Sequence, residues 1–352
     1  MSKNDYGFFD RLLHHFALRS THIQQMSFTI DQMLNRTDYE EVREKSHVFV
    51  SGLARAGTTA IMRLFYATSR YCSLTYRDMP FPLSPHLWHN IQGTSSKEGV
   101  MRERAHGDGL TVDYDSPEAL EEIFWRVFCN RQYILSDRLV PMEAEAETIE
   151  YFQQYIAAVL EVNLADRYLS KNNNNILRLA SIHAAFPNAV IIIPYRDPFQ
   201  QSLSLYRQHC RFIQAHRENN FAKNYMKWLV HHEFGSDHRF CDVGNGQSAR
   251  TPDEPGYWLD QWVNVYRFLL NETRDKKLNT IFVEYEELCD KPDMVWGALA
   301  KNAALDEDTL PAGFILSQAP DREWKCKSDD PIQEAKDVLA RLKRSRIHSD
   351  DE

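Results

Sequence analysis

The sequence predicts an α/β protein with a doubly wound, mostly parallel sheet and helices on both faces. Residues 47–50 (HVFV) form a short β-branched and aromatic run that leads through a glycine-containing loop into a helix-like segment at 60–67. Residues 189–195 (AVIIIPY) are nearly all apolar, as in a strand that helices cover on both faces. Strand-like and helix-like segments alternate along the chain. This alternation is typical of a parallel sheet whose ligand site lies beyond the carboxyl ends of its strands.

The other elements follow from local composition. Ser116 and Pro117 suit the N-cap and the first position of a helix, and Glu118 suits its first turn, so we expect a helix from there to about residue 130. Glu121 and Glu122 are expected on a solvated face of that helix. Further helices are expected over 8–33, 143–163, 176–186, 199–215 and 257–271, and further strands over 168–170 and 280–283.

Length and composition fit one large folded domain. The chain has 352 residues, of which 43% are hydrophobic and 26% charged, which excludes a disordered or fibrous protein. We expect a helical extension at 1–45, followed by a single domain at 46–345. Insertions around 78–115 and 235–256 are expected to lie on the side that binds a second substrate. The latter segment is rich in Gly, Ser, Asp, Asn and Pro and is predicted to be a long mobile loop.

Charge and motif content exclude several classes of protein. A formal net charge of −9 argues against nucleic-acid binding. No apolar run approaches the roughly 20 residues that span a bilayer, and the first residues lack the apolar core of a signal peptide. The six cysteines form no CxxC pair, and the HxxH pair His86 and His89 has no third ligand nearby. We therefore expect a cytoplasmic protein without a metal site.

The loop after the first strand has the pattern of a phosphate-binding loop. Gly52 and Gly57 have the five-residue offset of the GxxxxGK loop, in which backbone amides at a helix N-terminus face an anion. The usual lysine position holds Thr58, however, and Thr59 follows, while the cation is Arg55 inside the loop. This departure suits a terminal group that carries less charge than a γ-phosphate. The alternative is a glycine-containing turn capped by threonines.

A second anion site is predicted after the strand at 189–195. Arg196 directly follows this strand, where a guanidinium can clamp a phosphate with two hydrogen bonds. Ser204 comes eight residues later and reaches the same group only if the loop folds the arginine back toward the helix. The alternative is that Arg196 pairs with Asp197 or another neighbour. Two such sites on one sheet imply a ligand with separate phosphates.

These motifs resemble those of the sulfotransferases that use 3′-phosphoadenosine-5′-phosphosulfate (PAPS). SGLARAGTTAIMRL resembles the family's 5′-phosphosulfate loop, and FPNAVIIIPYRDPFQQSLS resembles its 3′-phosphate motif. FVEYEELCDKP and the lysine-containing strand end at Lys171 are further matches, in the family order over about residues 46–292. Arg55 and Ala60 replace the lysine and tryptophan of the cytosolic aryl enzymes, so the resemblance is closer to the bacterial and carbohydrate-directed branches.

The resemblance implies a PAPS-dependent sulfotransferase with a P-loop-type fold, and it suggests roles for individual residues. It implies in-line transfer to a hydroxyl or amine of a carbohydrate, lipid or small-molecule acceptor, without a metal. Arg196 and Ser204 would bind the 3′-phosphate, and Tyr285 would lie near the adenosine. The 5′-phosphosulfate would be held by Arg55, Ala56, Gly57, Thr58 and Thr59.

The resemblance also suggests where a general base could lie. The aryl branch has a histidine at the position of Asn173, which cannot accept a proton. Tyrosine- and glycan-directed relatives use a carboxylate shortly after the first helix, where Asp78 is the best match. A second candidate is His106, which Asp108 could orient between two glycines. Each candidate has a plain alternative as a polar turn residue.

Two other functions remain open from the sequence. A P-loop kinase for a small metabolite would need a lysine after Gly57 and an acidic Mg²⁺ ligand at a strand end, and the lysine is missing. A catalytically inactive nucleotide-binding adaptor would keep both anion motifs. Binding of the product nucleotide without sulfuryl transfer would distinguish the adaptor from the enzyme.

Overall fold

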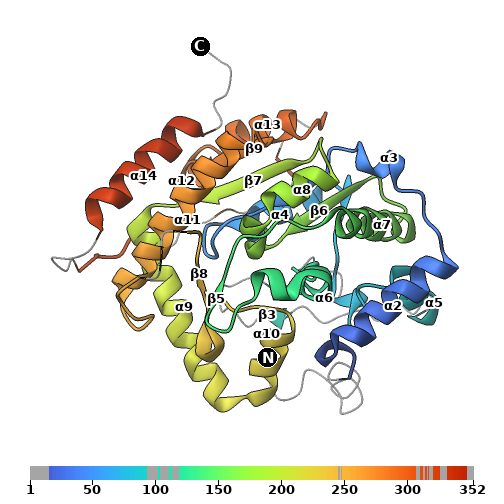
Figure 1. Cartoon of the computed structure of the whole chain (residues 1–352). Coiled ribbons are helices and arrows are strands. Elements are labelled where there is room, and N and C mark those ends of the chain that lie inside the picture. Colours follow the sequence, from blue (N-terminus) through green and yellow to red (C-terminus); the bar gives the residue numbers. More distant parts are fainter. Residues whose placement is uncertain are drawn as a thin grey trace.

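A computed structural model of the chain contains a five-stranded parallel sheet in the order β2-β6-β1-β7-β9 (Figure 1). The structure describes residues 16–92, 102–103, 111–112, 119–244, 246, 248–306, 310–311, 314, 316, 320–325 and 331–346. The strands are β1 (Val48–Val50), β2 (Tyr71–Cys72), β6 (Arg167–Lys171), β7 (Val190–Tyr195) and β9 (Thr280–Glu284). Because all five run the same way, their carboxyl ends share one edge. The predicted fold class is confirmed.

Helices cover both faces of this sheet because successive strand residues point to opposite sides. In β7, Val190 and Ile192 belong to the apolar core that also contains Ile61 of α4 and Trp296 of α13. Ile191 and Ile193 belong to a second core, which contains residues of α6, α7, α8, α11 and α14. This is why the strand reads as an uninterrupted apolar run. The helices concerned are α4 (Thr58–Ala67), α6 (Glu122–Tyr133), α7 (Ala146–Val162), α8 (Leu179–Ala185), α11 (Pro255–Asp275), α13 (Pro292–Asn302) and α14 (Ile332–Ser345).

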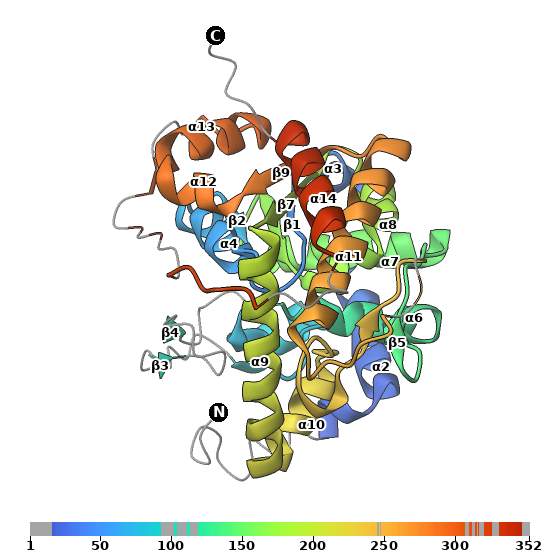
Figure 2. The ribbon, with the colours of Figure 1, turned by 90° about the vertical axis from the view of Figure 1, so that its left-hand side faces the viewer.

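The remaining elements lie outside this sheet, whose strands all end at one edge. Figure 2 shows α9 (Pro198–Glu218) as a long helix that runs from this edge toward α10 (Asn220–Trp228). None of the helices in the described ranges is long and apolar enough to cross a membrane. The other bounds are α2 (Thr21–Leu34), α3 (Glu40–Arg43), η1 (Tyr76–Asp78), α5 (Pro85–Gln92), β3 (Arg102–Glu103), β4 (Thr111–Val112), β5 (Arg138–Leu139), η2 (Asn173–Leu177), η3 (Gly235–Asp237), β8 (Phe240–Cys241) and α12 (Tyr285–Asp290).

Some local expectations need correction. The helix expected over 176–186 is a 3-10 turn, η2, followed by the shorter helix α8. The segment expected to be a long loop, 235–256, contains η3 and β8, and β8 pairs in parallel with β5. Strand β2 was not predicted, because two residues are too short to show a strand pattern. The helix start at Ser116 lies outside the described residues, and the division at residue 45 stays a prediction.

The expectation that Glu121 and Glu122 lie on a solvated face is wrong. Both are buried, with 2% and 1% of their surface exposed. Glu122 Oε2 accepts hydrogen bonds from Arg178 Nη2 and Asn172 Nδ2, both at 2.6 Å. Glu121 accepts from the Trp125 indole at 3.0 Å. Paired charge and satisfied oxygens offset the desolvation of these carboxylates, and Arg178 and Asn172 come from segments that a reading of this one helix cannot see.

Candidate nucleotide and sulfuryl-transfer site

The loop between β1 and α4 has the backbone conformation that its glycines allow. The Ser51 amide donates to the Ile192 carbonyl oxygen at 2.8 Å, which continues the β1–β7 ladder by one residue. Gly57 is the N-cap of α4 with φ +93°, and Arg55 also has a positive φ of 69°. Thr58 then begins the helix, so the amides of its first turn point out of the helix end. This geometry suits an anion at the end of the sheet.

The ring of Tyr285 packs directly on this loop. Tyr285 begins α12, immediately after β9. A Cβ atom at residue 57 would lie 2.2 Å from Cδ2 of the Tyr285 ring, so only glycine fits beside it. The guanidinium carbon of Arg196 lies 5.5 Å from the centre of the same ring. Tyr285 therefore lies between the two predicted anion sites.

Arg196 follows β7, as the sequence predicts, but its partner is Glu286. Arg196 Nε donates to Glu286 Oε1 at 3.0 Å, and the two side chains are 10% and 25% exposed. Asp197 instead caps α9 and accepts from the amides of Phe199 and Gln200 at 2.9 and 3.0 Å. Glu286 thus holds the Arg196 side chain at the end of the sheet. The Nη groups of Arg196 carry further donors for an anion.

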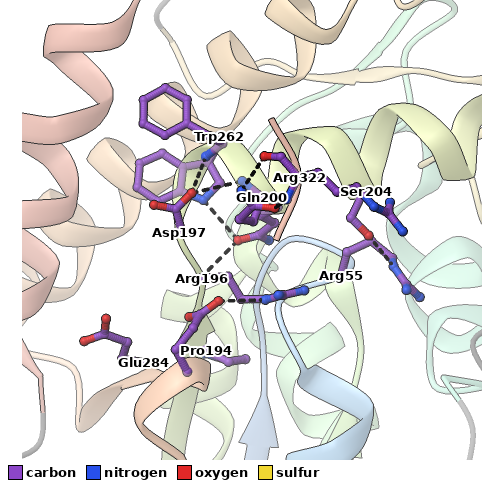
Figure 3. Close-up of polar contacts among 12 residues, drawn as sticks. Arg55, Pro194, Arg196, Asp197, Gln200, Ser204, Trp262, Glu284 and Arg322 are labelled. Carbon is purple, nitrogen blue, oxygen red and sulfur yellow. Dashed lines mark hydrogen bonds and ion pairs between the residues drawn. The ribbon is translucent and has the colours of Figure 1, made fainter. Parts of the chain in front are cut away.

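The two predicted anion motifs meet in the structure. Arg55 Nε donates to Ser204 Oγ at 3.0 Å across 149 residues of sequence (Figure 3). Ser204 lies on α9, two turns after its start. The loop after β1 and the start of α9 therefore lie next to each other. In this structure Ser204 contacts Arg55, and Arg196 contacts Glu286.

A buried glutamine joins the parts of this site, and sequence reasoning missed it. Gln201 has no exposed surface, and its Nε2 donates to the Ala54 carbonyl oxygen at 3.1 Å. Its Oε1 accepts from the Trp262 indole at 3.0 Å and from the Arg196 amide at 3.3 Å. Gln201 therefore fixes the phosphate loop, the end of β7 and α11 relative to one another. The QQSLS stretch gave no signal for this role beyond its polar residues.

The segment 320–325 crosses the start of α9, which the sequence did not predict either. Gln200 Nε2 donates to the Arg322 carbonyl oxygen at 2.9 Å, and the Arg322 amide donates back to Gln200 Oε1 at 3.0 Å (Figure 3). The rings of Phe199 and Trp324 are 5.5 Å apart. Burial, and after it the nearby charge of Arg207, lower the pKa of Arg322.

Lys171 lies at the end of β6, and Asp78 lies six residues after the end of β2. Lys171 ends β6, pairs in register with Val50 and is 8% exposed, so it lies beside the phosphate loop. Asp78 ends the 3-10 turn η1 after β2, where its Oδ2 accepts from the Thr75 amide at 2.6 Å and from Thr75 Oγ1 at 3.2 Å. Burial raises the pKa of Asp78 to about 6. A carboxyl group with this pKa exchanges a proton near neutral pH.

Of the remaining sequence candidates, the structure describes His86 and His89. His106 and Asp108 lie outside the described residues. His86 Nδ1 lies 3.1 Å from Asp31 Oδ2, in a contact between α5 and α2. Among the residues that the structure describes, no group of three or more His, Cys, Asp or Glu side chains is arranged to hold a metal ion.

The chain has known relatives in sequence profile and in fold. The profile of the Sulfotransferase family matches residues 47–308. A sulfotransferase from Mycobacterium tuberculosis (STF1) has a similar fold, with a TM-score of 0.50, 13% identity, and coverage of 96% of this chain and 82% of that one. A sulfotransferase from Mycobacterium avium (STF9) matches with a TM-score of 0.45 and 13% identity over 98% of this chain and 80% of that one. No curated protein sequence matches the chain. The profile covers most of the residues that build the site and well over half of the sequence, and this chain belongs to the sulfotransferase family.

Proposed function

We propose that this sulfotransferase takes its sulfuryl group from PAPS and transfers it to a hydroxyl or amine of its acceptor by in-line displacement. The observation that carries the proposal is the contact between Arg55 and Ser204, which joins the two anion motifs in one site. A donor with a 5′-phosphosulfate and a separate 3′-phosphate is the ligand that such a paired site suits. The threonine at position 58, in place of a lysine, argues against a nucleoside triphosphate.

The described residues suit this donor on physical grounds. The positive φ of Gly57 turns the chain so that the first amides of α4 face the end of the sheet, where Arg55 adds a cation. Arg55, Ala56, Gly57, Thr58 and Thr59 would hold the 5′-phosphosulfate, and Arg196 and Ser204 the 3′-phosphate. Tyr285, packed between the two groups, would contact the nucleoside.

During transfer the acceptor oxygen or nitrogen forms a bond to sulfur while the sulfur–oxygen bond to the nucleotide breaks. Negative charge grows on the bridging oxygen of the departing nucleotide. Arg55 and the N-terminus of α4 would stabilise this charge, because preorganised donors act most strongly where charge develops. Lys171, buried beside the loop, would stabilise the sulfuryl oxygens. No metal takes part in this scheme.

The proton of the acceptor must pass to a base. Asp78 is the proposed base, because its pKa of about 6 leaves it mostly ionised at pH 7 and still basic enough to accept a proton. His106 stays the second sequence-based candidate. The acceptor class proposed from the sequence is a carbohydrate, a lipid or a small molecule, and the cytoplasmic location stays a prediction.

A comparison of ligands tests the donor. We expect 3′-phosphoadenosine-5′-phosphate without metal to raise the melting temperature, since a ligand at 100 times its dissociation constant adds about 2.7 kcal/mol. Stabilisation by ATP with Mg²⁺ alone would overturn the proposal in favour of a kinase. Transfer of radioactive sulfate from labelled PAPS to an acceptor separates the enzyme from an adaptor, which would bind the bisphosphate without turnover.

A further inference from the structure

A pocket opens beside the contact between Arg55 and Ser204. The space between its walls is about 530 Å³ when the part open to solvent is included, and its cavity volume is about 50 Å³. Leu53 and Ala54, which precede Arg55 in the phosphate loop, form one side, and Leu205, which follows Ser204 on α9, forms another. The pocket therefore borders both the loop that carries Arg55 and the helix α9 that carries Ser204. A molecule bound in it would touch the chain neighbours of Arg55 and Ser204.

The wall of this pocket is mostly apolar. Besides Leu53 and Leu205, its lining includes Ile176, Leu177 and Trp258. Trp258 is 3% exposed and packs on His238, with 4.9 Å between the ring centres. A wall that is mostly apolar binds aliphatic or aromatic surface better than it binds the many hydroxyls of a sugar.

Two of the polar lining residues already serve the protein. His238 has both ring nitrogens in contacts, Nε2 with the Tyr257 hydroxyl at 2.8 Å and Nδ1 with the His232 carbonyl oxygen at 3.1 Å. Arg239 Nη1 donates to the Leu135 carbonyl oxygen at 2.6 Å. These contacts fix the segment between η3 and β8 as a wall of the pocket.

Glu233 brings a negative charge to the apolar wall. Its Oε1 accepts from Asn173 Nδ2 at 3.1 Å, and its Oε2 lies 3.7 Å from His231 Nδ1. Its side chain keeps 20% of its surface exposed. Burial raises the pKa of Glu233, but the hydrogen bond and charge of His231 and the bond from Asn173 outweigh burial and hold the pKa below its usual value. Two carboxylate oxygens offer about four acceptor positions, more than these partners use.

We propose that this pocket is the acceptor site, and that it selects a mainly apolar acceptor which carries a hydrogen-bond donor for Glu233 besides the group that receives sulfate. The inference rests on the proposed function and narrows its acceptor class away from sugars. Glu233 is a specificity-determining residue in this scheme. The reacting group lies at the Leu53 and Ala54 end, and the second donor lies at the Glu233 end.

A matched series of phenols tests the proposal. Tyramine carries an ammonium donor, 4-(2-hydroxyethyl)phenol a neutral donor, and 4-ethylphenol neither, while 3-(4-hydroxyphenyl)propionate carries a negative charge instead. Binding to the complex with 3′-phosphoadenosine-5′-phosphate is measured by calorimetry, and transfer is measured from labelled PAPS. We expect tyramine or the hydroxyethyl phenol to exceed 4-ethylphenol by about 10- to 100-fold, the range for a hydrogen bond to a charged group. The stronger of the two shows whether the donor is an ammonium or a hydroxyl group.

Glu233→Gln should remove this preference while leaving binding of the bisphosphate unchanged. Glu218→Gln, at the exposed end of α9, is the matched control and should keep the preference. Glu233→Asp keeps the charge and provides a second variant if the glutamine variant fails to fold. The proposal is overturned if no phenol binds, if the propionate or N-acetylglucosamine is preferred, or if the preference survives in Glu233→Gln. Failure of the bisphosphate to bind the wild-type protein would instead refute the proposed donor.

Discussion

Replacing Gly57 by alanine tests the packing at the centre of the site. Gly57 has φ +93°, and an alanine Cβ would lie 2.2, 2.7 and 2.9 Å from three atoms of the Tyr285 ring. The closest contact falls short of an ordinary 3.4 Å separation by about 1.2 Å. A left-handed residue that is not glycine costs about 1–2 kcal/mol, and overpacking costs about 1–3 kcal/mol. We therefore expect Gly57→Ala to lower the free energy of unfolding by about 2–5 kcal/mol.

The two contributions are separable by a second substitution. Tyr285→Ala removes the ring but leaves the backbone conformation, so Gly57→Ala in that background should cost only the conformational part, about 1–2 kcal/mol. Urea unfolding of the wild type, both single variants and the double variant measures the coupling directly. Additive effects would show that the ring does not pack on residue 57. A Gly57→Ala variant within about 0.5 kcal/mol of wild type, the usual range for surface substitutions, would refute the reasoning as a whole.

Three further outcomes are expected. Arg196→Ala should weaken binding of 3′-phosphoadenosine-5′-phosphate about tenfold or more, the equivalent of one charge-assisted hydrogen bond, and leave binding of AMP nearly unchanged. Calorimetry with both nucleotides measures the two affinities. Equal losses of affinity would contradict a role of Arg196 in binding the 3′-phosphate. Asp78→Asn should lower kcat with little change in bisphosphate affinity. In the wild type kcat should fall as the pH drops through about 6, because burial raises the pKa of Asp78 to about 6 and protonation removes the base. A kcat that is constant from pH 5 to 8 would exclude Asp78 as the base. Arg178→Met should lower the free energy of unfolding by about 3–5 kcal/mol, because it leaves the Glu122 carboxylate buried and unpaired. Urea unfolding measures this loss. A loss under about 1 kcal/mol would show that the pair is not buried as described.

The sequence by itself determined four of the five strands of the sheet, all but β2, and the glycine-containing loop before α4. A strand that helices cover on both faces of the sheet is apolar at nearly every position. Residues 189–195 show this pattern directly. The loop before α4 is equally local, since a left-handed N-cap favours glycine at residue 57. Features of this kind depend on neighbours within a few residues, so they leave a readable pattern.

The tertiary structure alone decided how the side chains pair. Ser204 meets Arg55 from 149 residues away, and Arg196 finds Glu286 rather than Asp197, whose carboxylate is needed to cap α9. Glu122 appears solvated on its own helix and becomes buried because Arg178 comes to it from another element. Hydrogen bonds and ion pairs are short-range contacts between groups that any part of the chain can supply. Their partners are therefore fixed by the arrangement of strand ends in space, which local sequence pattern does not encode.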